Sequence, residues 1–112
     1  MGPSILAEAD RKKLDNGMEL RLLSALEVLQ ARREAEDLAR EDRERALCSN
    51  ACLLARALEH EGGPVFDSGR AVLAGLTVAE IAALSRQWQE FDRAVNPGLS
   101  LGEGELEHLK KN

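Results

Sequence analysis

The chain is poor in the side chains that usually build small-molecule sites. Its 112 residues include no Tyr, two Phe, one Trp and two Cys. Deep ligand pockets are commonly lined by aromatic side chains, so this composition disfavours a small-molecule site. The core must come from Leu, Ala, Val and Ile, and a chain of this length predicts a single domain, residues 1–112.

The sequence also lacks a long apolar run and a basic stripe. No segment approaches the roughly 20 apolar residues of a membrane helix, and no charged leader precedes an apolar stretch. The net charge is -5, and acidic and basic residues are mixed in both halves, which leaves no surface for a phosphate backbone. We therefore expect a cytoplasmic protein that binds neither nucleic acid nor a membrane.

Residues that could carry catalysis or bind a metal are few and scattered. Cys48 and Cys52 lie four apart on one predicted helical face, and His60 lies two helical turns further along, about 12 Å away. Three ligands cannot converge from one straight helix, so these thiols are expected to be structural. We expect no metal, no cofactor and no catalytic residue, and hence a non-enzymatic protein.

A long stretch without proline or glycine dominates the sequence. It predicts one helix over residues 24–61, opened by Ser24 and Glu27 at capping-box spacing. Such a helix would be about 55 Å long, more than the diameter of so small a domain, and it therefore needs a partner segment. A kink at Ser49-Asn50 stays open, although the pattern favours continuity.

The predicted long helix has apolar ends and a charged middle. Leu22 to Leu29 and Leu47 to Leu58 carry enough apolar surface to join a core. The middle alternates acids and arginines at helical spacings that contribute about 0.2–0.5 kcal/mol per pair. Through it runs a seam of mostly small side chains that lets another helix approach closely, a helix of this chain, of a second copy or of a partner. The seam includes Ala31, Ala35 and Leu38.

Shorter elements are expected on either side. Ser4 can cap a helix over Ile5 to Leu14, which Asn16-Gly17 would end. Met18 to Leu22 alternates like a strand, but a lone pair of strands would be marginal. A further short helix is expected from Arg70 to Ala74. With no other strand pattern, the sequence predicts an all-α fold.

A second clear helix is predicted over residues 77–95, where Thr77 and Glu80 form another capping box. We expect it to pack on the long helix. Its apolar stripe is either core or a face that binds a partner, and the sequence leaves both open. Residues 99–112 are expected to form a C-terminal tail that could be mobile. The stripe includes Ile81, Leu84, Trp88 and Phe91.

Several stretches, taken in order, carry a resemblance to a known family. They are Ile5 to Leu14 with Asn16-Gly17, Leu53 to Leu58, Pro64 to Gly69, Leu73 to Ile81, and Trp88 to Pro97. Their order resembles that in small tail assembly chaperones of tailed bacteriophages and prophages. The resemblance covers most of the chain as a helical pattern, without a diagnostic motif.

The resemblance implies a non-enzymatic role. Proteins of this family are thought to coat the long, apolar, helical tape measure protein and to keep it soluble until tail tube subunits displace them. A tape measure-like helical protein would then be the partner, and self-association into a homo-oligomer stays open. The alternative function is a structural or adaptor protein that forms a stable oligomer in a larger assembly such as a virion. The candidate partner-binding residues are Ala31, Ala35, Leu38, Ile81, Leu84, Trp88 and Phe91.

Overall fold

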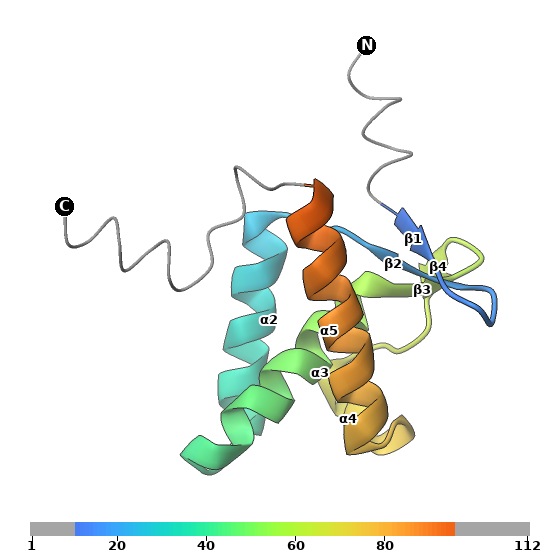
Figure 1. Ribbon diagram of the computed structural model, residues 1–112. Coiled ribbons are helices and arrows are strands. Elements are labelled where there is room, and N and C mark those ends of the chain that lie inside the picture. Colours follow the sequence, from blue (N-terminus) through green and yellow to red (C-terminus); the bar gives the residue numbers. More distant parts are fainter. Residues whose placement is uncertain (1–10, 96–112) are drawn as a thin grey trace, which may run out of the picture.

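The structure contains an antiparallel sheet, so the expectation of an all-α fold was wrong. The computed structural model describes residues 11–95. Four strands lie in the order β1-β2-β3-β4, and the helices pack to one side of this sheet (Figure 1). The strands are β1 (Arg11–Lys13), β2 (Met18–Arg21), β3 (Leu58–His60) and β4 (Gly63–Pro64).

The first two strands form a hairpin where a helix ending at Leu14 was predicted. Asn16-Gly17 does make the expected turn, and Gly17 adopts a φ of 82°, which glycine reaches without steric cost. Leu14 N–H donates to Met18 O at 2.8 Å and so closes a hairpin. The alternating segment from Met18 is stable as a strand because β2 pairs with β1 on one side and β3 on the other.

The predicted long helix is broken into two helices. α2 (Ala25–Leu38) ends before an extended turn, in which Ala39 has a ψ of 131° and Glu41 a ψ of 154°. A short 3-10 segment, η1 (Asp42–Glu44), then leads into α3 (Arg45–Ala57). The break therefore lies at residues 39–41, whereas Ser49-Asn50 lies inside the continuous α3.

Burial of the small-residue seam explains why the chain turns back. Ala31 and Ala35 of α2 form a buried cluster with Cys48 and Cys52 of α3. In a straight helix the two alanines would lie far from the two thiols and would lose this cover, and surface ion pairs are each too weak to offset that loss. A salt bridge of 3.5 Å between Arg45 and Glu36 joins the two helices beside the turn.

The end of the predicted helix is a strand instead. α3 stops at Ala57, and Leu58, only 1% exposed, lies opposite Leu20 in the sheet. Glu61 and Gly62 both have positive φ values, 54° and 83°, and form a two-residue turn between β3 and β4. Pairing with β2 thus replaces the last helical turn.

The two later helices agree with the sequence. α4 (Gly69–Gly75) is capped by Ser68, and α5 (Val78–Val95) begins with the predicted capping box. In that box Glu80 N–H donates to Thr77 Oγ1 at 3.1 Å, and Thr77 N–H donates to Glu80 Oε1 at 2.8 Å. The predicted tail, residues 99–112, lies outside the described residues.

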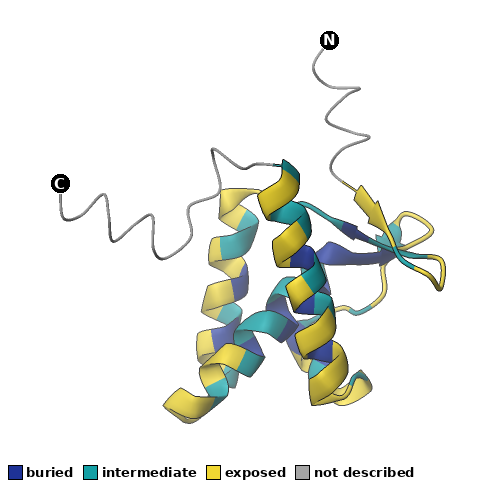
Figure 2. Ribbon diagram, in the orientation of Figure 1, coloured by how far each residue is buried: buried dark blue, intermediate teal, exposed yellow. Residues whose placement is uncertain are grey.

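The main core lies where α3, α4 and α5 meet the sheet. Figure 2 shows the buried residues gathered around α3 and along the inner sides of α2 and α5. None of the helices within residues 11–95 is both long enough and apolar enough to cross a membrane. The largest fully buried side chains are Leu20, Leu54, Leu58, Ile81, Val72 and Cys52.

Candidate functional site

The seam on α2 is occupied by a helix of the same chain. Ala31 is 2% exposed and Ala35 is 5% exposed, because α3 covers both. Leu38 packs half-buried against the same cluster. The helix that packs on the seam therefore belongs to this chain and not to a second copy or a partner. A partner cannot reach the two alanines in the folded chain.

The stripe on α5 is largely core. Ile81 is 1% exposed and Trp88 is 7% exposed, and both belong to the main core cluster. Trp88 Nε1 also donates to Arg21 O at 2.8 Å, so the indole ties α5 to the end of β2. Leu84 and Phe91 are half-buried. Of the seven candidate residues, Leu38, Leu84 and Phe91 are the ones that retain substantial exposure.

Among the leucines of residues 11–95, the most exposed ones lie on α2 instead. Leu26 is 59% exposed and Leu29 is 46% exposed. Three residues apart on a helix, they share one face. Leu22, of intermediate exposure, lies before this helix begins. The sequence assigned this end of the helix to the core. The spacing of the apolar residues could be read from the sequence. Which side of α2 is covered by α3 could not.

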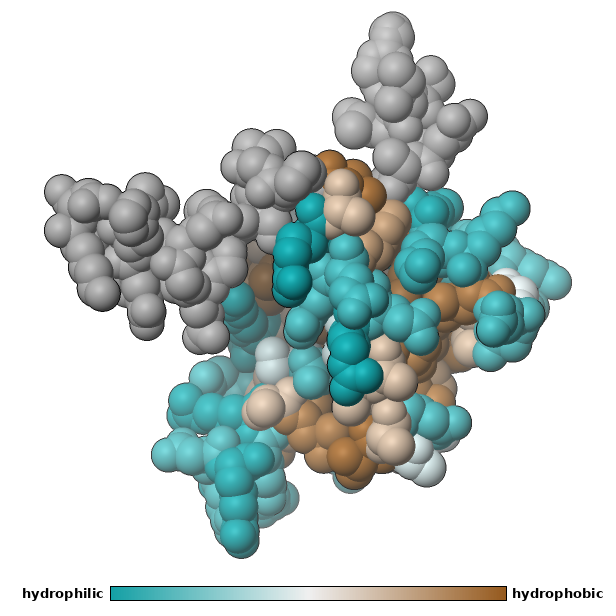
Figure 3. Space-filling view, in the orientation of Figure 1, coloured by the Kyte–Doolittle hydropathy of each residue, from teal (hydrophilic) through white to brown (hydrophobic). Residues whose placement is uncertain are grey.

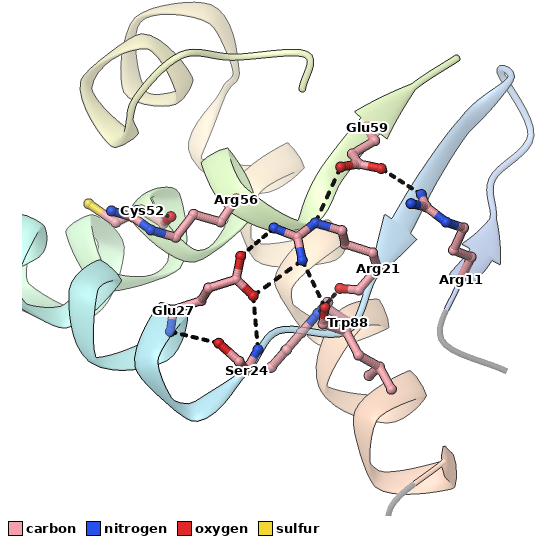
Figure 4. Close-up of polar contacts among 9 residues, drawn as sticks. Arg11, Arg21, Ser24, Glu27, Cys52, Arg56, Glu59 and Trp88 are labelled. Carbon is pink, nitrogen blue, oxygen red and sulfur yellow. Dashed lines mark hydrogen bonds and ion pairs between the residues drawn. The ribbon is translucent and has the colours of Figure 1, made fainter. Parts of the chain in front are cut away.

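An ion-pair cluster holds the start of α2 against the sheet. Arg21 at the end of β2 binds Glu27 through two hydrogen bonds, of 2.6 and 3.2 Å, while Ser24 and Glu27 complete the predicted capping box (Figure 4). The hydrogen bonds from Arg21 are the main reason that the pKa of Glu27 falls to about 2. Arg21 also pairs with Glu59 on β3 at 3.2 Å, so the first turn of α2 is tied to two strands.

A second polar contact, centred on Glu34, joins α2, α3 and α4. Glu34 of α2 accepts from Arg56 of α3 at 2.7 Å and from the Gly69 N–H at the start of α4, also at 2.7 Å. Burial opposes ionisation of Glu34, but these hydrogen bonds prevail and lower its pKa. The position of the exposed leucines is therefore determined by a well-anchored helix.

A groove lies between the β1–β2 hairpin and α5. Its volume is about 430 Å³. Apolar atoms are visible between the charged surfaces of α5 and of the strands beside it (Figure 3). The lining is partly apolar and partly polar. Its apolar residues are Leu14, Met18, Leu76, Ala83 and Leu84. Its charged and polar residues are Lys12, Lys13, Asp15, Glu80, Asn16 and Gln87.

The thiols are placed as structural side chains. Cys48 and Cys52 are free and buried. Burial raises the pKa of Cys52 to about 12, and it also raises the pKa of Cys48. Both are therefore protonated at neutral pH. In the part of the chain that the structure describes, no three His, Cys, Asp or Glu side chains are grouped so that they could hold a metal ion.

The chain was compared with family models, curated proteins and solved structures. No family model, curated protein or solved structure matches it. On the surface formed by residues 11–95, the α2 leucines and the groove beside α5 are apolar features that could contact another molecule.

Proposed function

We propose that the protein is a non-enzymatic assembly chaperone, which binds an apolar helical stretch of another protein and keeps it soluble. The order of sequence features resembles phage tail assembly chaperones, and the proposed partner is accordingly a tape measure-like helical protein. The proposed compartment is the cytoplasm of the host cell in which the tail assembles.

The exposed leucines of α2 are the observation that carries this proposal. Leu26 and Leu29 lie side by side on a helix whose other face packs on α3. Spacings of three and four residues are those by which helices present apolar side chains to a groove or to another helix. An apolar helix laid along this face would remove both leucines from water.

The size of this surface favours a transient contact. Full burial of a leucine contributes about 1.5–3 kcal/mol, so covering two half-exposed leucines contributes about 2 kcal/mol in total. Polar residues, Gln30 and Arg33, lie next to them on the exposed side of α2. A partner held in this way could be released when subunits with a larger interface compete for it, as chaperone function requires.

A co-expression experiment tests the proposal. A tape measure protein fragment from the same genome is produced with the wild-type protein or with a variant carrying Leu26→Glu and Leu29→Glu, and its soluble fraction is measured. We expect the wild type to keep the fragment in solution and the variant to lose most of that effect. Val78→Glu is the matched control, because Val78 is 65% exposed but lies on α5.

Other outcomes would contradict the proposal. Equal soluble fractions with the wild type and the α2 variant would remove the leucines from the binding surface. A gene that does not lie between those of a tail tube protein and a very long tape measure protein would refute the phage role. Sedimentation of the protein alone as a stable, concentration-independent oligomer would favour the structural or adaptor function instead.

A further inference from the structure

The sheet has a free edge at β1. This strand pairs with β2 alone among the described residues. In an antiparallel pair, opposite residues alternate between hydrogen-bonded and non-hydrogen-bonded. Leu14 is bonded to Met18 opposite it, so Lys12 with Leu20 is the next hydrogen-bonded pair. The N–H and C=O groups of Arg11 and Lys13 therefore point away from β2, toward the free edge.

The two sides of this edge differ in chemistry. Lys12 lies opposite the buried Leu20 in the register, so its side chain leaves the sheet on the side facing the helices. Arg11 and Lys13 leave on the other side, where Arg11 pairs with Glu19 and Glu59. A strand added beside β1 would therefore place alternate side chains toward the helices and toward these two basic residues.

The groove described above adjoins this edge. Lys12, Lys13 and Leu14 line it from the hairpin, and Leu84 lines it from α5. An apolar side chain on the helix-facing side of an added strand would thus enter a space that already has an apolar lining. The edge and the groove together define one continuous surface for an extended segment.

The charge of the edge selects its partner. Lys12 and Lys13 form no salt bridge within residues 11–95, and all three residues of β1 are basic and exposed. Pairing of two copies through β1 would bring like charges together, which destabilises cross-strand pairs. Charged edge strands commonly prevent self-association in this way. An acidic strand meets no such obstacle.

We propose that the free edge of β1 binds an extended segment of another protein in which apolar and acidic residues alternate. The segment adds a fifth strand, with its backbone bonded to Arg11 and Lys13, an acidic side chain beside Lys13 and an apolar side chain in the groove. This surface is separate from the α2 leucines, and the inference holds whether or not α2 binds a helix.

Backbone amide hydrogen exchange, followed by NMR, tests the inference. The probe is a synthetic, end-blocked peptide of alternating glutamate and valine, and the matched peptide carries lysine in place of glutamate. At ten times its Kd, the acidic peptide should slow exchange of the Arg11 and Lys13 amides about tenfold. The Lys12 amide, already bonded to β2, is the internal control and should change little.

A charge reversal supplies the second arm of the experiment. Lys13→Glu should weaken binding of the acidic peptide at least about tenfold, because it replaces an attraction with a repulsion beside the added strand. Arg70→Glu makes the same charge change on α4 and should leave binding unaltered. Unchanged amide shifts elsewhere show that both variants are folded.

Several results would overturn the inference. One is the absence of any slowing with the acidic peptide, and another is equal binding of the lysine peptide. Shifts confined to the groove, with Arg11 and Lys13 still exchanging freely, would show side-chain binding without strand addition. Protection of these amides in the protein alone at high concentration would identify a second copy as the occupant.

Discussion

Replacement of Gly69 by alanine is expected to destabilise the protein, although alanine is normally the better helix residue by about 0.5–1 kcal/mol. A Cβ at Gly69 would lie 2.3 Å from the Sγ of Cys52, 3.0 Å from its Cα and 3.2 Å from its Cβ. The Cα belongs to the backbone of α3, so α4 would have to move away. Overpacking of this kind costs about 1–3 kcal/mol.

The same movement would weaken another contact. The Gly69 N–H donates to the carboxylate of Glu34 at 2.7 Å, and hydrogen bonds to charged groups contribute about 1.5–3 kcal/mol. With the helix preference of alanine subtracted and part of this bond lost, we expect Gly69→Ala to reduce the free energy of unfolding by about 2 kcal/mol. The thermal midpoint should fall by about 8 °C or more.

Urea and thermal unfolding, followed by circular dichroism, measure this loss. Gly75→Ala is the matched control, because the Cβ there would meet only the outer atoms of the half-buried Phe66 ring, at 2.7 Å, and no backbone atom. In the double variant Cys52→Ala with Gly69→Ala, the closest contact is absent. Its loss of unfolding free energy should therefore be about 1 kcal/mol smaller than the sum of the losses in the two single variants. If Gly69→Ala is as stable as the wild type, the close approach of α4 to α3 is refuted.

Two further predictions concern Trp88 and Glu27. Trp88→Ala should lower the free energy of unfolding by about 3–5 kcal/mol, because the indole is buried and bonded to β2, whereas an unchanged thermal midpoint with lost partner binding would place it on a functional surface. The folded pKa of Glu27, about 2, lies below its ordinary value of 4.5, so its contribution to stability is fully present above pH 4.5 and is lost as the pH falls toward 2. The stability difference between wild type and Glu27→Gln, measured by urea unfolding, should therefore shrink over that pH range; a difference that stays constant would show that the ion pair with Arg21 does not stabilise the fold.

Local signals in the sequence predicted the starts of α2 and α5 correctly, whereas the start of α3 at Arg45 was missed. Ser24 with Glu27 and Thr77 with Glu80 form the expected capping boxes, since a cap depends on side chains only three residues apart. The turn at Asn16-Gly17 was also predicted. The turn joins two strands, whereas the sequence predicted a helix before it. Met18–Arg21 is stable as a strand because it pairs with Leu58–His60, which lies far along the chain, and no local pattern reveals that pairing.

The burial of the apolar faces was predicted less well than the helix caps. Apolar spacing identified Ile81 and Trp88 but could not separate core from surface, and the structure places both in the core. Leu26 and Leu29 were assigned to the core and are exposed. Whether an apolar face is covered depends on which other element packs against it, and that is a property of the tertiary fold.

Local sequence patterns were enough to place the capped starts of α2, α4 and α5, the Asn16-Gly17 turn and the alternation of charge along the chain. Each of these depends on neighbours within about one helical turn. Contacts between distant segments determine that the long helical stretch folds back at residues 39–41, that its end becomes a strand, and that α3 covers the alanine seam. Those outcomes follow from burial of apolar surface between distant segments, which outweighs the small energies of local ion pairs.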